Sequence, residues 1–140
     1  MYQPKDKLEL RELIADEYIN LGDINTSNIT DMSELFLNST RKDFSGIEKW
    51  DTSNVENMIG MFVSCENFNQ PLNDWNVSNV KDMSSMFFEC ENFNQPLDTW
   101  DVSNVEDMSD MLYGCHKFNK EQALMRLFKK FQNQMKMLVS

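Results

Sequence analysis

Three cysteines recur at a fixed interval of 25 residues, at positions Cys65, Cys90 and Cys115. Thiols in such an array could bind zinc, form disulfides or act as nucleophiles. If the interval reflects stacked rungs, equivalent residues lie about 4.8 Å apart, and Cys65 and Cys115 are then about 10 Å apart. Zinc holds its thiolates at about 2.3 Å from one centre, which this spacing does not permit. A disulfide between neighbouring rungs fits the usual Cα separation of roughly 4.4–6.8 Å, but three cysteines cannot all pair. We therefore predict buried, reduced thiols that bind no metal.

The other candidates for catalysis lack partners. His116 is the only histidine and directly follows Cys115, and neighbours in an extended segment point to opposite faces. A Cys-His dyad is therefore not expected, and His116 is interpreted as a surface residue. The aspartates form neither an EF-hand loop nor a glycine-rich calcium-binding nonapeptide. We expect no enzyme, and hence no catalytic, cofactor-binding or metal-binding residues and no cofactor.

The cysteines belong to a longer repeating unit. The segment Trp50 to Val55 recurs at Trp75 and at Trp100 with the same interval of 25 residues. The apolar and amide residues that follow keep this interval: Met58/Met83/Met108, Met61/Met86/Met111, Phe68/Phe93/Phe118, Asn54/Asn79/Asn104 and Asn69/Asn94/Asn119. Such a period is typical of stacked rungs, in which these columns form the core and the amides bond from rung to rung.

A degenerate fourth copy precedes these three. It begins at Ile24, which lies 26 residues before Trp50. Eight positions separate Phe36 from Phe44 in this copy, whereas Phe62 and Phe68 are six apart. The longer spacing indicates a loop that bulges from the first rung.

Local patterns divide the chain into three parts. Asp6 and Glu9 have the spacing of a capping box, which predicts a helix over 7–16 and then a short strand over 18–21, so that residues 1–21 form an N-terminal cap. Residues 22–119 form the repeat solenoid, where each rung is expected to hold a short helix and a short strand. Residues 120–140 carry an apolar stripe at helical spacing with lysines beside it. We predict a C-terminal capping helix there, with a membrane-surface or partner-binding helix as the alternative.

The size and charge of the chain limit the functions that it could have. The chain of 140 residues suits one domain, and no apolar run approaches the roughly 20 residues of a membrane span. Residues 1–119 hold 8 Lys/Arg against 22 Asp/Glu, a formal charge of −14. Such an acidic body disfavours direct nucleic-acid binding and favours a protein partner with a basic surface. The N-terminus lacks the apolar stretch of a secretory signal, so we expect a soluble, cytoplasmic protein. We also expect it to be a monomer.

The repeat also resembles a known family. The pattern V-x-D-M-S-x-M-F-x-x-C-x-x-F-N-Q-P-L-x-x-W-x-V-S-N-V runs from Val80 to Val105 and is similar to the repeats of BspA-like leucine-rich-repeat proteins of bacteria. The resemblance covers about residues 22–119. It implies an α/β leucine-rich-repeat-like solenoid of about four rungs, with helical caps at both ends. It also implies binding of other macromolecules, often at the cell surface, and no enzymatic activity. A cell-surface location is therefore the alternative to the cytoplasm.

A binding site is best sought where the repeats differ. Val63, Phe88 and Tyr113 occupy one column, with Leu37 as its first member. A column that accepts such different residues is less constrained than the core, and exposed aromatic residues are common interface anchors. We predict a partner-binding surface in which this column is accompanied by acidic residues of neighbouring columns: Glu56, Glu89 and Glu106. The alternative is that the aromatic residues only extend the core.

Two functions fit this surface. The first is a non-catalytic protein-protein interaction module that presents a rigid acidic face. The second is a small acidic antagonist, such as an immunity protein or enzyme inhibitor, that blocks a basic partner such as a nuclease.

Overall fold

The computed structural model describes residues 1–119. Their regular structure consists of one α-helix, α1 (Lys7–Ile14), and two 3-10 helices, η1 (Leu21–Asp23) and η2 (Ile47–Lys49). Helix α1 starts where the sequence predicts, because the Asp6 carboxylate accepts a hydrogen bond from the Glu9 N–H at 3.0 Å. The helix ends before Asp16, and turns that lead into η1 replace the strand expected over 18–21.

The predicted fold class, an α/β leucine-rich-repeat-like solenoid, is wrong. Residues 1–119 contain no strand and no sheet, and their repeats contain no α-helix. Extended pairing is limited to isolated parallel bridges, which join Tyr2 to Ile24, Asp31 to Asn57, Asn57 to Asp82 and Asp82 to Asp107. The second helical cap, predicted for residues 120–140, lies outside the described residues.

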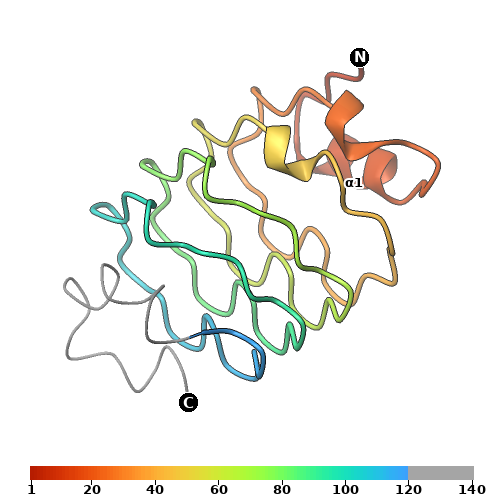
Figure 1. Ribbon diagram of the computed structural model, residues 1–140. Helices are drawn as coiled ribbons and strands as arrows, with labels where there is room; N and C mark the ends of the chain where they lie inside the picture. The colour runs from red at the N-terminus through yellow and green to blue at the C-terminus, as the bar shows by residue number, and fades with distance from the viewer. Residues whose placement is uncertain (120–140) are drawn as a thin grey trace.

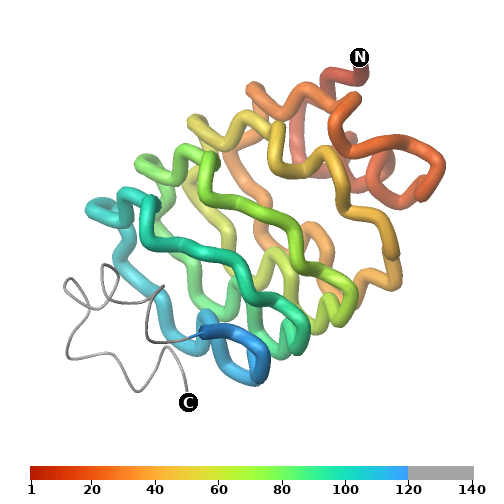
Figure 2. The backbone as a smooth tube through the Cα atoms, viewed as in Figure 1, coloured from red at the N-terminus to blue at the C-terminus, as the bar shows by residue number. Residues whose placement is uncertain are grey.

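Irregular coil takes the place of the expected helices and strands. Successive lengths of this coil, each about one repeat long, lie side by side in order of sequence (Figures 1 and 2). Backbone hydrogen bonds join each repeat to the next. The Met58 N–H donates to the Asp82 carbonyl at 3.0 Å, and the Phe62 N–H donates to the Met86 carbonyl at 2.9 Å. The interval of the sequence is therefore present in the backbone pairing, although no sheet results.

Left-handed backbone explains why the apolar spacing does not produce a helix. Two residues of each repeat have φ between 54° and 76°: Glu34 and Asn38, Gly60 and Ser64, Ser85 and Glu89, Asp110 and Gly114. A left-handed residue ends right-handed helical winding. Neighbouring N–H groups therefore alternate between acceptors in their own repeat and acceptors in the next one. The Met61 N–H donates to the Met58 carbonyl of the same repeat, while the Phe62 N–H donates to the next repeat. The apolar residues whose spacing predicted a helix therefore lie in a series of turns.

Stacked phenylalanines form the centre of the core. The rings of Phe36, Phe62 and Phe87 follow one another at centroid distances of 5.5 and 5.6 Å, with interplanar angles of 3°. Each tryptophan packs on one of these rings, as Trp75 does on Phe62 at 6.4 Å. The Trp75 indole Nε1 also donates to the Ile47 carbonyl at 3.0 Å. Each indole N–H is thereby satisfied inside the core, as burial requires.

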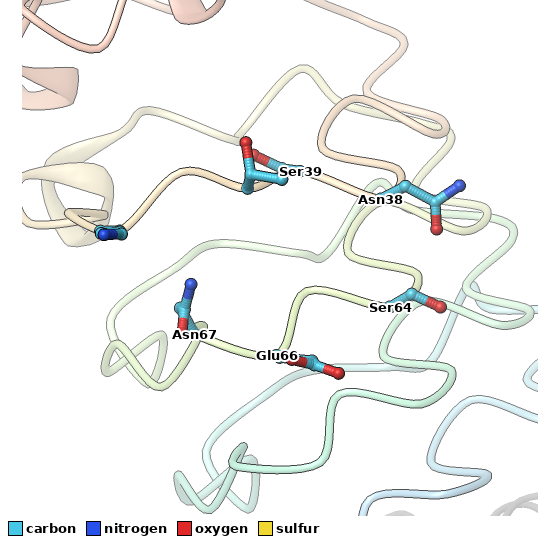
Figure 3. Close-up of a pocket in the computed structure, with 7 residues that line it drawn as sticks. Asn38, Ser39, Ser64, Glu66 and Asn67 are labelled. Atoms are coloured by element: carbon cyan, nitrogen blue, oxygen red, sulfur yellow. The ribbon is translucent and has the colours of Figure 1, made fainter.

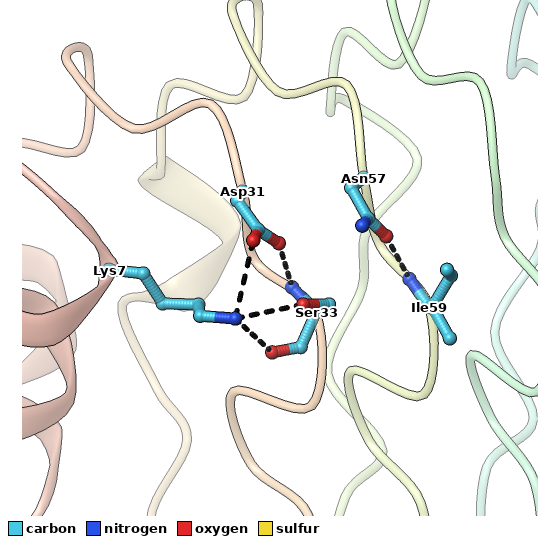
Figure 4. Close-up of polar contacts among 5 residues, drawn as sticks. All are labelled: Lys7, Asp31, Ser33, Asn57 and Ile59. Carbon is cyan, nitrogen blue, oxygen red and sulfur yellow. Dashed lines mark hydrogen bonds and ion pairs between the residues drawn. The ribbon is translucent and has the colours of Figure 1, made fainter.

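Side chains tie the N-terminal segment to the first repeat. Lys7 Nζ of α1 lies 3.3 Å from Asp31 Oδ2 and 2.9 Å from Ser33 Oγ (Figure 4). Asp31 Oδ1 in turn accepts from the Ser33 N–H, as Asn57 Oδ1 does from the Ile59 N–H in the next repeat. Partial burial opposes ionisation of Asp31, but the Ser33 hydrogen bonds and the Lys7 charge outweigh it and lower its pKa. The cap and the first repeat therefore share one polar network.

Candidate functional site

The variable column of the sequence forms one continuous line on the structure. We call Leu37, Val63, Phe88 and Tyr113 the aromatic column. Backbone hydrogen bonds beside it hold the repeats in register, since the N–H groups of Asn38, Ser64 and Glu89 donate to the carbonyls of Val63, Phe88 and Tyr113 at 2.8, 2.8 and 2.6 Å.

The backbone next to the column turns sharply. A left-handed residue follows each member of the column, and the residue after that is a buried cysteine in three of the four repeats. The chain therefore leaves the core at the column and returns two positions later. Leu37 is 42% exposed and Tyr113 is 40% exposed, while Val63 and Phe88 between them are half-buried.

Phe88 and Tyr113 form an aromatic pair at the surface. Their ring centroids are 4.9 Å apart and their planes differ by 13°, so the rings stack. Stacking of this kind limits side-chain motion, which reduces the entropy that a binding partner must overcome. The two residues thus have the geometry of a preformed anchor.

The acidic residues predicted beside the column divide into two groups. Glu89 directly follows Phe88, and Ser64 Oγ lies 3.5 Å from Glu89 Oε2. Glu56 instead forms an ion pair with Lys81 at 3.2 Å, and the Glu106 N–H donates to the Lys81 carbonyl at 2.7 Å. The Glu89 N–H also donates to the carbonyl of Tyr113 in the aromatic column, whereas Glu56 and Glu106 both contact Lys81.

The cysteines lie beneath this surface and are free thiols. Cys65 Sγ donates to the Phe36 carbonyl at 2.9 Å, and Cys90 Sγ donates to the Phe62 carbonyl at 2.8 Å. Burial raises the pKa of Cys65 to about 12 and also raises that of Cys90. Such thiols are poor nucleophiles at neutral pH, because the thiolate is the reactive form. No group of three or more His, Cys, Asp or Glu side chains within residues 1–119 is placed to hold a metal ion.

The asparagines of the repeat serve the backbone. Asn79 Nδ2 donates to the Ser53 carbonyl at 2.7 Å, and Asn69 Oδ1 accepts from the Asn94 N–H at 2.8 Å. Equivalent bonds recur in the neighbouring repeats. The amide columns therefore join repeats, as predicted. His116 is exposed and lies 3.7 Å from the Glu91 carboxylate.

Beside the first two members of the aromatic column lies a pocket that sequence reasoning missed. Its volume is about 350 Å³, and it is lined by Asn38, Ser39, Thr40, Lys42, Ser64, Glu66 and Asn67. Asn38 and Ser39 come from the first repeat, while Ser64, Glu66 and Asn67 come from the neighbouring length of chain (Figure 3). The long spacing between Phe36 and Phe44 was the available signal.

The sequence was also compared with known proteins. The family described as Mycoplasma protein of unknown function, DUF285, matches residues 10–135. The chain belongs to this family. No curated protein and no solved structure matches the chain. Because the description of the DUF285 family names no activity, the function has to be argued from the surface.

The described part of this DUF285 protein contains no candidate for a membrane-spanning helix. None of the helices within residues 1–119 has the length and apolar character needed to cross a bilayer.

Proposed function

We propose that this protein is a non-catalytic protein-binding module whose contact surface is centred on the aromatic column. The observation that carries the proposal is the stacked pair of Phe88 and Tyr113, in which Tyr113 remains 40% exposed although its ring contacts another aromatic ring. Partly exposed, immobilised aromatic rings are the commonest anchors of protein interfaces. The resemblance of the repeat to BspA-like proteins points to the same class of function.

The frame behind the column supports this proposal. Interface anchors bind best when their positions are fixed before the partner arrives. Here the column is backed by buried phenylalanines and by backbone hydrogen bonds of 2.6 to 2.8 Å between repeats. A partner would therefore meet a surface that needs little reorganisation.

Charge indicates the character of the partner. The formal charge of residues 1–119 is −14, and Glu89 lies directly beside the column. Negative potential of this size attracts a basic protein surface and speeds association. The same charge favours a second candidate function, in which the protein is an antagonist that occupies the basic substrate surface of an enzyme such as a nuclease.

The proposal is tested by affinity capture with matched variants. Wild-type protein, the double variant Phe88→Ala/Tyr113→Ala and the control Tyr18→Ala are immobilised and exposed to a lysate of the native host. Tyr18 is fully exposed and lies outside the column, so its removal controls for loss of any surface aromatic ring. We expect a partner that wild type and Tyr18→Ala retain and the double variant loses.

Purified partner then gives the kinetic test. Loss of the two rings should mainly raise the dissociation rate, while Glu89→Gln should mainly slow association and weaken its salt dependence. The proposal fails if the folded double variant captures the same proteins with unchanged rates. Inhibition of a captured enzyme by the wild-type protein would identify the antagonist function.

A further inference from the structure

The pocket next to the aromatic column owes its existence to the longer first repeat. Phe36 and Phe44 meet edge to face at 5.4 Å, whereas the equivalent Phe62 and Phe68 stack at 4.0 Å with an interplanar angle of 14°. The two extra residues between Phe36 and Phe44 move the segment 38–43 away from the path that later repeats follow. A cavity of about 350 Å³ opens between this segment and Ser64 to Asn67 of the next repeat.

Arg41 holds the wall of this pocket in place. Its side chain is buried, with only 5% of the residue exposed. Its guanidinium donates to the carbonyls of Asp43, Ile14 and Ile19 at 2.8, 2.9 and 2.5 Å. The segment that contains Ser39, Thr40 and Lys42 is thereby fastened to the N-terminal cap, and the pocket is formed before any ligand binds.

Polar groups at the pocket lack the partners that their equivalents have. Asn92, the equivalent of Asn67 in the next repeat, donates its amide to the Glu66 carbonyl at 2.6 Å. Asn67 makes no such bond within residues 1–119. Glu91 has His116 as its ionic neighbour at 3.7 Å. The equivalent Glu66 has no ion-pair partner in the described part of the chain, and neither does Lys42.

The residues that line the pocket indicate which chemical class of ligand it could bind. A divalent cation needs several carboxylate oxygens, and a phosphate group needs clustered positive donors. The pocket has a single carboxylate, Glu66, and a single ammonium group, Lys42, and the rest of its lining offers amides and hydroxyls. It also lacks an aromatic ring on which a flat ligand could stack. A molecule that carries one positive and one negative group matches this set of partners.

We propose that this pocket binds a small zwitterionic ligand of the amino-acid type. The ligand carboxylate faces Lys42 and its ammonium group faces Glu66. The side chains of Asn38 and Asn67 bond either end, because an amide both donates and accepts. This site lies beside the protein-binding surface proposed above, but the proposal does not depend on that surface.

The test uses 6-aminohexanoate as the probe and side-chain amide resonances of the ¹⁵N-labelled full chain as the readout. Hexanoate and hexylamine each carry only one of the two charges. We expect saturable shifts of the Asn38 and Asn67 amides with 6-aminohexanoate, and binding about tenfold weaker or worse with either comparison compound. Equal binding of hexanoate or hexylamine, or no saturable shift up to the solubility of the probe, would overturn the proposal.

Variants locate the two charges. Lys42→Met and Glu66→Gln should each weaken binding of the probe about tenfold. The charge-swapped variant Lys42→Glu/Glu66→Lys should recover binding, since the ligand can enter in the opposite orientation. Lys49→Met and Glu91→Gln remove the same charges outside the pocket and should leave binding unchanged. Retained binding in both pocket variants, with the fold intact, would place the ligand elsewhere.

Discussion

Gly46 lies so close to Gly22 that a β-carbon on Gly46 would be 2.3 Å from the Gly22 backbone nitrogen. Gly46 also has a φ of 96°, in the left-handed region that side chains disfavour. Gly46→Ala should therefore lower the free energy of unfolding by roughly 2–4 kcal/mol, through a backbone clash and a strained conformation. Urea denaturation measures this loss. In the control Gly60→Ala, where the nearest atom is a side-chain carbon at 3.3 Å, we expect a loss of only about 1 kcal/mol.

Arg41 stabilises the junction between the cap and the first repeat. Replacement by methionine keeps an apolar stem but leaves the carbonyls of Ile14, Ile19 and Asp43 without their donor. The free energy of unfolding should fall by about 3 kcal/mol or more. Arg41→Lys should recover little of it, because a single ammonium group cannot reach three carbonyls in the planar geometry of a guanidinium. Arg11→Met, an exposed change in α1, serves as the control, and equal stability of both variants would contradict the prediction.

Trp75 contributes both packing and a hydrogen bond. Its ring stacks on Phe62, and its indole N–H donates to the Ile47 carbonyl at 3.0 Å. Trp75→Ala should lower the unfolding free energy by about 3–5 kcal/mol. Trp75→Phe retains most of the packing and should cost about 1–3 kcal/mol, mainly for the carbonyl that loses its donor. Thermal denaturation of the two variants separates these contributions, and a melting temperature of Trp75→Ala within a degree or two of wild type would refute the prediction.

The sequence predicts the register of the repeats far better than their backbone conformation. A fixed interval reveals which side chains share a column, so the buried methionines, phenylalanines and cysteines were identified correctly. The backbone conformation between the columns was not predicted correctly, because an i, i+3 spacing of apolar residues fits a helix and a chain of turns equally well. Glycine marks the left-handed positions at Gly60 and Gly114, but Ser85 and Glu89 adopt the same conformation without any signal.

The candidate site was likewise predicted only in part from the sequence. Comparison of the repeats led to Phe88 and Tyr113, which the structure stacks together. The acidic rim stays a prediction, and the ion pair that Glu56 forms with Lys81 could not be predicted because it depends on how far the chain turns between columns. The pocket was missed because the direction in which two extra residues bulge depends on Arg41, two of whose carbonyl partners, Ile14 and Ile19, are 27 and 22 residues away in the sequence.

The buried thiols should make stability fall at alkaline pH. Burial raises the pKa of Cys65 from 9.0 to about 12 and also raises that of Cys90, so the folded protein holds these protons more tightly than the unfolded chain. Their contribution is complete below pH 9, where both states are protonated, and is lost progressively as the pH rises from there through the folded pKa. Between pH 8 and pH 10 the unfolding free energy should fall by about 1 kcal/mol for each thiol.

The measurement is the urea midpoint of wild type and of Cys65→Ala at both pH values. Lysine and tyrosine also titrate in this range, but their contribution is common to the two proteins and cancels in the difference. Cys65→Ala should be less stable than wild type at pH 8, because the substitution leaves a cavity, and the gap should narrow at pH 10. A gap that stays constant or widens would show that the Cys65 thiol ionises as easily in the folded protein as in the unfolded chain.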